Sequence, residues 1–356
     1  MKMAVAELSR LAAAQVTVRP YRAGDRERWS AFVERCPEAT FFHRIEWKDV
    51  IESIFRHRTH YLLAESAGEI VGILPLAEVR SLLFGHSLVS LPFCVYGGSA
   101  TLDPQAGHAL HLTARELAKD LGVSHLELRN RTIKEPDWPR QDLYVTFRKE
   151  ILPEVEANML AIPRKQRAMV RKGIQRGLRS EFDDGVERFF ELYADNVHRH
   201  GTPALSKRYF AALREVFGDD CRILTVLAPN GRPISSVVTF YFRNEVLPYY
   251  AGDDERAREL AGNDFKYWAL LEDGCTRGYR IFDYGRSKQG TGSFAFKKNW
   301  GFEPAPLAYE YALLRSDRIP DNNPLNPKYR AFIAAWRRLP IGLANMLGPH
   351  IVRSLG

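Results

Sequence analysis

The sequence predicts an α/β (α+β) protein built from two tandem domains of one fold. The chain has 356 residues, which is long for one domain. The order hairpin, strand, helix, strand occurs twice, and matched positions recur at a nearly constant spacing. These positions lie 154 to 163 residues apart: Gly68 and Gly231, Tyr96 and Tyr250, Gly122 and Gly278, Arg129 and Arg286. Such a long repeat predicts an internal duplication, each copy a mixed sheet flanked by helices.

The elements of the first copy follow from local patterns. Trp29, Phe32 and Val33 have helical spacing, and Gly122 stands where a helix C-terminus prefers glycine. We expect a strand at 16–19, helices over 24–36 and within 39–55, a hairpin over 60–79, an apolar strand over 82–95, a helix over 108–121 and a strand over 124–129.

The second copy repeats this order after two helices. We expect helices over 186–199 and 206–217, a hairpin over 222–242, a strand over 246–251, a helix over 264–277 and a strand over 280–284. The expected domains are 1–155, 156–315, and a linker with an amphipathic tail over 316–356.

Composition indicates a soluble protein with an acidic or phosphorylated partner, or with affinity for an anionic membrane surface. The net charge is +8 and the pI about 9.3. The four cysteines form no closely spaced pair, so we expect buried thiols in a reducing compartment and no metal site. The N-terminal segment lacks the apolar core of a signal peptide. No apolar run is as long as the about 18 residues that a membrane-spanning helix needs. The expected location is the cytoplasm, or the inner face of the membrane.

A basic segment joins the two copies. Seven cations and no acid lie between Arg164 and Arg179, on an expected amphipathic helix that ends near Gly173 or Gly177. A solvated charged face is the simple interpretation. Because like charges at helical spacing repel one another, an anionic ligand is the alternative. The candidate binding residues here are Arg167, Arg171 and Lys172.

The stretch 279–302 is typical of an anion site. A strand over 280–284 is expected to break into a glycine-rich turn at 285–292, followed by a helix over 293–299. Backbone N–H groups of such a turn and the helix N-terminus both attract negative charge. The candidate binding residues are Arg286, Lys288, Gly290 and Gly292. An ordinary strand-to-helix connection is the alternative.

The C-terminal tail combines a proline- and asparagine-rich linker with a basic amphipathic stretch over 329–355. Docking onto the second domain is the default expectation. The alternative is an anionic membrane surface, because arginines flank the apolar residues. Pro340 and Pro349 are expected to break the helix, which weakens that alternative.

Five motifs resemble the Fem-type (FemAB/FemX-like) transferases, in particular the branch associated with exosortase/PEP-CTERM exopolysaccharide loci. The motifs are FHRIEW at 42–47, RKQRAMVRKGIQRG at 164–177, HGTPALSKRYF at 200–210, YYAGDD at 249–254 and FDYGRSKQGTGSFAFKKNWGF at 282–302. The last is the most specific, and the resemblance covers most of the chain. It implies two GNAT-like (acetyltransferase-like) domains in tandem, which agrees with the duplication.

The resemblance also implies acyl transfer to an amine. Family members take an aminoacyl group from charged tRNA and form an amide on a cell-envelope precursor. A phenylalanine–lysine pair of the family looks like Phe296 and Lys297, with Lys297 holding the developing oxyanion. Trp47, Tyr249 and Tyr250 resemble substrate-binding positions. The implied acceptor is a phosphorylated or lipid-linked sugar or peptide precursor, including those of exopolysaccharides.

Three points stay open at the level of sequence. The general base is Asp283, Asp253 or Tyr284, and no pattern ranks them. The donor is aminoacyl-tRNA or acyl-CoA, with no permanently bound cofactor: Ser287 replaces the glutamine or arginine of the coenzyme A motif, and no coiled-coil arm for tRNA is present. The alternatives in function are a GNAT-type N-acetyltransferase that uses acyl-CoA and a non-enzymatic nucleic-acid or membrane-binding protein.

Overall fold

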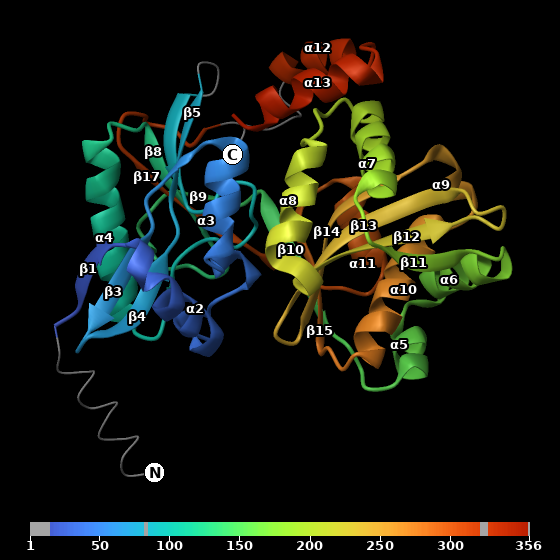
Figure 1. Ribbon diagram of the computed structural model, residues 1–356, viewed down its shortest axis with the longest axis horizontal. Coiled ribbons are helices and arrows are strands. Elements are labelled where there is room, and N and C mark those ends of the chain that lie inside the picture. Colours follow the sequence, from blue (N-terminus) through green and yellow to red (C-terminus); the bar gives the residue numbers. More distant parts are fainter. Residues whose placement is uncertain (1–14, 82–84, 321–326, 355–356) are drawn as a thin grey trace. The chain divides into compact units, whose positions relative to one another are not determined.

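The computed structural model describes residues 15–81, 85–320 and 327–354. The chain divides into two compact units (Figure 1). The first unit runs to Asp142 and includes the segment Leu307–Pro320, and the second comprises Leu143–Pro306 and the C-terminal helices. The domain boundaries expected from the sequence lie at residues 155 and 315, whereas these compact units divide the chain after Asp142 and after Pro306. The expectations for the N-terminus before residue 15 and for the linker at 321–326 concern residues outside the described part.

The first unit contains two sheets. Their strand orders are β1-β3-β4-β7 and β2-β5-β6-β8-β17-β9. The strands are β1 (Thr17–Pro20), β2 (Arg58–Thr59), β3 (Leu62–Ser66), β4 (Glu69–Leu74), β5 (Ala77–Ser81), β6 (Gly85–Val89), β7 (Ala100–Thr101), β8 (His125–Asn130), β9 (Arg140–Gln141) and β17 (Ala308–Leu313). The helices are η1 (Ala23–Asp25), α2 (Arg26–Arg35), η2 (Phe41–His43), α3 (Glu46–Val50), the π-helical turn η3 (Ile51–Phe55) and α4 (Pro104–Asp120).

Helix α4 closes the core of the first unit because its small and apolar residues recur at helical spacing. Ala106, Leu110, Ala114 and Ala118 are buried on one face, against Leu62, Leu126 and their neighbours on the strands. Asp103 caps the helix by accepting from the backbone N–H of Gln105 at 2.9 Å.

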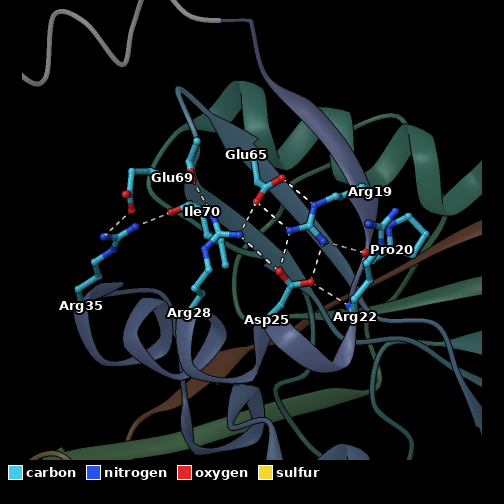
Figure 2. Close-up of polar contacts among 10 residues, drawn as sticks. Arg19, Pro20, Arg22, Asp25, Arg28, Arg35, Glu65, Glu69 and Ile70 are labelled. Carbon is cyan, nitrogen blue, oxygen red and sulfur yellow. Dashed lines mark hydrogen bonds and ion pairs between the residues drawn. The ribbon is translucent and has the colours of Figure 1, made fainter.

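An ion-pair cluster joins β1 to β3 and to the start of α2 (Figure 2). The guanidinium of Arg19 donates to both oxygens of Asp25 at 2.7 Å and to Glu65 at 2.8 and 2.9 Å. Arg28 reaches Glu65 at 2.9 Å. The hydrogen bonds from Arg19 lower the pKa of Asp25 to about 2. The cations of this region are therefore matched by carboxylates.

The second unit contains a sheet of order β11-β12-β13-β14-β15-β10-β16. Its strands are β10 (Tyr144–Glu150), β11 (Arg179–Asp183), β12 (Cys221–Leu227), β13 (Pro233–Phe242), β14 (Glu245–Asp253), β15 (Ile281–Lys288) and β16 (Pro304–Pro306). Its helices are α5 (Val155–Ala161), α6 (Arg164–Gln175), α7 (Glu187–Arg199), α8 (Lys207–Phe217), η4 (Gly218–Asp220), α9 (Glu255–Glu259), α10 (Gly262–Thr276), α11 (Gly292–Asn299), α12 (Pro327–Trp336) and α13 (Ile341–Val352).

Helices cover both faces of this sheet (Figure 1). On β13, Val237 and Tyr241 join the core that includes Trp268 and Leu270 of α10. Phe240, on the opposite face by strand alternation, packs against Phe217 of α8. Helices α7 and α8 therefore lie on one face, while α10 lies on the other with α5 and α6 packed against it.

The structure confirms the α/β class and the tandem arrangement. Strand β6 pairs in parallel with β8, and β14 pairs in parallel with β15. Gly68 and Gly231 occupy equivalent hairpin turns with φ of +83° and +82°. Arg129 lies on β8 and Arg286 on the corresponding strand β15. The four cysteines are buried and free, as expected.

Two local predictions were wrong. Strand β15 continues through Gly285, Arg286 and Ser287 to Lys288, so the glycine-rich turn is confined to the few residues before α11. Pro349 lies inside α13, which continues to Val352, so this proline does not break the helix. Pro340 does break the helix as expected: α12 ends at Trp336, and Pro340 is the N-cap of α13.

Candidate functional site

The candidate site lies where β14 and β15 separate. These strands pair at two positions, Glu245 with Ile281 and Val246 with Phe282. Beyond them β15 carries an extra residue relative to β10, because Thr146 faces Arg286 while Arg148 faces Asp283. Gly285 sits in this bulge with φ +62°, a backbone conformation that favours glycine. The bulge changes the direction of backbone groups of β15 at the point where β14 no longer pairs with this strand.

Lys297 of α11 binds these redirected carbonyl groups. Its Nζ donates to the carbonyl oxygen of Tyr284 at 2.7 Å, and to those of Gly285 and Arg286 at 3.3 Å each. The side chain is buried, with 7% of the residue exposed. Burial lowers the pKa of Lys297 to about 7; nearby Asp283 opposes this shift and Arg286 adds to it. Near neutral pH the amine is therefore divided between its charged and neutral forms.

Asp283 is held inside the sheet by a charge-assisted hydrogen bond. Its carboxylate accepts from Arg148 at 2.5 Å and from the backbone N–H of Gly285 at 2.7 Å. Arg148 also pairs with Glu245. The residue is fully buried. Its position makes it a support for the bulge beside Lys297 and argues against direct proton transfer with a substrate.

Phe296 connects α11 to α10 through aromatic contacts. Its half-buried ring lies 5.5 Å from that of Tyr267 and 5.9 Å from that of Trp300. The indole N–H of Trp300 donates to Asp264 at 2.9 Å, and Gln166 of α6 donates to the same carboxylate oxygen at 3.0 Å. One buried carboxylate thus fixes α6 and the end of α11 to α10.

Tyr284 does not suit the role of general base. Burial raises the pKa of its phenol well above the usual value near 10. Its hydroxyl has no hydrogen-bond partner within the described part of the chain. Asp253, the third candidate, keeps an accessible carboxylate at the end of β14, where it accepts from Lys266 Nζ at 2.7 Å and from Ser235.

The predicted anion-binding residues of 285–292 are divided between a strand and a helix start. Arg286 is exposed on β15, and its guanidinium lies 4.4 Å from the centroid of the Tyr144 ring. Lys288 ends the same strand. Gly290 and Gly292 are exposed next to the N-terminus of α11, where Thr291 caps the helix by accepting from the N–H of Phe294 at 3.3 Å. This end of the helix is open to solvent.

Tyr249 and Tyr250 lie on the other face of the sheet. A bulge in β14 leaves Tyr249 opposite no residue of β13, so both rings point toward α7 and α8. Tyr250 donates to or accepts from Tyr209 of α8 at 3.0 Å and packs against Phe210. Both tyrosines are half-buried. They flank the same strand separation as Lys297, but from the α7 and α8 side.

The basic segment forms α6 as predicted, and its cations are uncompensated. Gln166, Val170 and Gly173 face inward, while Arg167, Arg171 and Lys172 lie on the outer surface with other basic residues. Within the described residues, none of the cations between Arg164 and Arg179 forms an ion pair, and Arg167 donates only to the carbonyl of Leu160 at 3.1 Å. Pro163, just before α6, lies against Gly301, just after α11.

Trp47 lies in the core of the first unit, which corrects its assignment as a substrate-binding residue. It is 0% exposed, its indole N–H donates to the carbonyl of Phe41 at 3.2 Å, and its ring packs against Phe41 and Phe42. The FHRIEW motif therefore reflects packing at this position.

A polar cavity of about 240 Å³ lies in the first unit next to this motif. Most of its polar wall is satisfied internally: His43 donates to the carbonyl of Gly98 at 2.8 Å, and Asn130 donates to Glu310 at 2.6 Å. Lys134 pairs with Glu38. Arg131, whose guanidinium lies over the Tyr96 ring at 5.5 Å, has no carboxylate partner among the described residues. No local pattern predicts this cavity, because its residues come from three separate segments of the chain, 37–43, 96–99 and 129–134.

Lys266, Arg148 and Arg131 are further residues that sequence patterns did not identify. Lys266 looks like an ordinary helix residue but is fully buried against Asp253.

No group of three or more histidine, cysteine, aspartate or glutamate side chains in the described part of the chain is arranged to hold a metal ion. In that same part of the chain, no helix is long and apolar enough to cross a membrane.

Comparisons with known proteins agree with this geometry. Residues 164–298 match the acetyltransferase (GNAT) domain family. The solved structure of FemX is similar with a TM-score of 0.63 and 14% identity, over 84% of this chain and 98% of FemX. A tandem GNAT protein from the clavulanic acid biosynthesis pathway gives a TM-score of 0.52 and 15% identity, over 86% of this chain and 100% of that protein.

A third similar structure is the C-terminal domain of a putative lysylphosphatidylglycerol synthetase from Agrobacterium fabrum. It gives a TM-score of 0.55 and 13% identity, over 81% of this chain and 92% of that domain. No curated protein sequence matches the chain significantly. At these identities the likeness concerns the fold. Residues 164–298 of the second unit thus match a GNAT acetyltransferase domain, and the fold as a whole is similar to that of tandem GNAT proteins.

Proposed function

We propose that the protein transfers an acyl group from a phosphorylated carrier to an amine, with Lys297 stabilising the tetrahedral intermediate. The observation that carries this proposal is a buried lysine bound to the bulged strand β15 where β14 leaves it, within the acetyltransferase domain. A buried cation at such a position acts in a low dielectric, where it interacts strongly with developing negative charge.

In the proposed reaction the amine nitrogen attacks the acyl carbonyl carbon and forms a C–N bond. The carbonyl oxygen becomes an oxyanion, and the bond to the carrier then breaks as the carrier leaves with a proton. The two 3.3 Å contacts of Lys297 are long for hydrogen bonds, so an N–H group can turn from Gly285 or Arg286 to the oxyanion. The 2.7 Å bond to Tyr284 would keep the side chain in place meanwhile.

We assign the donor and the acceptor to opposite faces of the sheet. The carrier would bind on the side of α6 and α11, where Arg167, Arg171, Lys172, Arg286 and Lys288 offer positive charge to phosphates. The amine would approach from the side of Tyr249 and Tyr250. The carboxylate of Asp253 pairs with Lys266 of α10 on the carrier side, and it would accept the proton of the amine where the two faces meet at the strand separation. Asp283 would position the bulge and neutralise the charge of Arg148. This is a supporting role, in place of the general base that the sequence analysis offered as one possibility.

Acyl-CoA is the donor that the acetyltransferase domain favours, since domains of this type use it as substrate. Aminoacyl-tRNA, the donor implied by the Fem-type motifs, is the second candidate. For the acceptor we propose an amine on a cell-envelope precursor, including exopolysaccharide precursors. The likeness to FemX and to a putative lysylphosphatidylglycerol synthetase domain supports that choice.

The donor can be tested by thermal unfolding of the purified protein with acetyl-CoA, longer acyl-CoAs, and charged or uncharged tRNA. A ligand present at a hundred times its Kd stabilises the folded state by about 2.7 kcal/mol. We expect acyl-CoA to raise the melting temperature, and the variant with Arg167, Arg171 and Lys172 changed to Gln to lose most of that shift. A shift with charged tRNA alone would identify aminoacyl-tRNA as the donor in place of acyl-CoA. If none of these ligands shifts the melting temperature, the proposal of a phosphorylated carrier is contradicted.

A further inference from the structure

The C-terminal tail has an unusual charge composition. From Lys328 to Gly356 there is no aspartate or glutamate, while the cations are Lys328, Arg330, Arg337, Arg338 and Arg353. Helix α13 itself contains no lysine, arginine, aspartate or glutamate. A helix without charged residues is normally buried, but one face of α13 is exposed to solvent.

One side of the tail is seated on the second unit. Trp336, Ala344 and Gly348 are buried. At Gly348 a Cβ would lie 2.9 Å from the carbonyl oxygen of Ala204, so only glycine lets α13 approach the connection between α7 and α8 this closely. The guanidinium of Arg337 donates to the carbonyl of His200 at 3.3 Å. This side confirms that the tail docks onto the second unit.

The opposite side of the tail carries large apolar residues in contact with solvent. Half of the large apolar side chains that are exposed in the described residues belong to these two helices. They are between 39 and 59% exposed: Phe332, Ile341, Leu343, Met346 and Leu347. Ala344 and Gly348 face the protein four residues apart, while Leu343, Met346 and Leu347 fall on the outer face at helical spacing. Soluble monomers rarely leave such residues together without a partner.

We propose that this outer face of α12 and α13 docks the protein onto the surface of an anionic phospholipid bilayer. The apolar side chains would enter the acyl boundary, and the arginines at both ends of α13 would meet the phosphates. The 12 residues of α13 span about 18 Å, well short of the about 30 Å hydrocarbon core, so the helix lies in the interface. The charge decides the occupant: a face bordered by cations without any acid fits anionic headgroups better than a second copy of itself.

This inference goes beyond acyl transfer and does not depend on it, because vesicle binding is measured without turnover. The full-length protein is sedimented with vesicles of phosphatidylcholine alone and of equal parts phosphatidylcholine and phosphatidylglycerol. We expect binding to the anionic vesicles that weakens with salt, and little binding to the neutral ones. The double substitution Met346→Glu and Leu347→Glu should reduce the partition coefficient at least tenfold. Arg338→Gln should reduce it about fivefold on anionic vesicles only.

The matched control is Leu112→Glu, which charges an equally exposed apolar residue on α4 of the first unit and should leave binding unchanged. Thermal unfolding establishes that each variant is folded. Equal binding of the double variant and the unsubstituted protein would overturn the proposal, as would the absence of binding to anionic vesicles. Analytical ultracentrifugation supplies the remaining outcome: a dimer that the double variant converts to monomers would assign the face to a second copy and overturn the lipid assignment.

Discussion

The two units place an arginine at equivalent points of their parallel strand pair and use it in opposite ways. Arg129 of β8 is buried; it pairs with Glu127 at 2.7 Å and donates to the carbonyl of Cys94 at 3.0 Å. Arg286 of β15 is exposed over the ring of Tyr144. In the first unit the arginine therefore closes the opening between the strands. In the second, the backbone carbonyls beside Arg286 bind Lys297 instead.

This difference fits our proposal that the second unit keeps a reactive lysine, while the matching position of the first unit is structural. The cations of the first unit that join strands, Arg19, Arg28 and Arg129, have carboxylate partners. In the second unit Lys297 is held by carbonyl groups, which stabilise its charge less than a carboxylate would, and its pKa is lowered by burial. A lysine held in this way can change its charge state or its hydrogen bonds near neutral pH.

The largest expected effect separates the two arginines. Arg129→Met removes a buried guanidinium that pairs with half-buried Glu127, and should lower the free energy of unfolding by about 3 kcal/mol. Arg286→Met removes an exposed guanidinium that stacks on Tyr144, and should cost less, about 0.5 to 1 kcal/mol for that contact. Urea unfolding of both variants measures this contrast. Equal losses would mean that the two positions play the same structural part.

The pH dependence of stability sharpens the assignment of Lys297. Its pKa is about 7 in the folded protein, against a usual value of 10.5 in the unfolded chain. Between these values the unfolded chain binds more protons, so stability should rise as pH increases from about 7 toward about 10.5, and it should be lost as pH falls back through that window. Lys297→Met should flatten this part of the profile. Parallel pH profiles for the two proteins, from urea unfolding, would contradict a lowered pKa.

The smallest expected effect on stability concerns α6. Changing Arg167, Arg171 and Lys172 to Gln removes exposed or half-buried charges that form no ion pairs, so the free energy of unfolding should change by at most about 0.5 kcal/mol. Affinity for the phosphorylated carrier should fall and become less dependent on salt. Arg115→Gln on α4, an exposed cation of the first unit, is the control for charge alone. A collapse of the melting temperature in the triple variant would make these residues structural.

Local patterns predicted both hairpins and most of the longer helices, because apolar periodicity and glycine C-caps are encoded in neighbouring residues, but they did not predict α5 and α9. They also predicted α6 and the amphipathic tail. The pattern could not predict that β17 pairs with β8 of the first unit or that β10 pairs with β15 of the second. Those pairings join residues far apart in sequence, and the pairing of β17 with β8 explains why 307–320 belongs to the first unit.

The candidate site was predicted in part. The lysine of the Phe296–Lys297 pair proves to be buried, a fact that its neighbour Lys298, exposed on the same helix, does not suggest. The sequence pattern predicts a turn that starts at Gly285, although a glycine inside a strand is equally typical of a β-bulge. Trp47 and Asp283 are buried by contacts that depend on tertiary packing. Residue type and spacing do not reveal such contacts.

The most direct test of the account compares Lys297→Met with Lys298→Met in acyl transfer. Labelled acetyl-CoA or labelled aminoacyl-tRNA is incubated with detergent-solubilised envelope precursors, and the label joined to the acceptor is counted. We expect Lys297→Met to lower the rate about 100- to 1,000-fold, the usual loss for an oxyanion donor, while Lys298→Met transfers normally. Transfer by Lys297→Met at the rate of the unsubstituted protein would contradict the claim that the second unit reacts through this buried lysine.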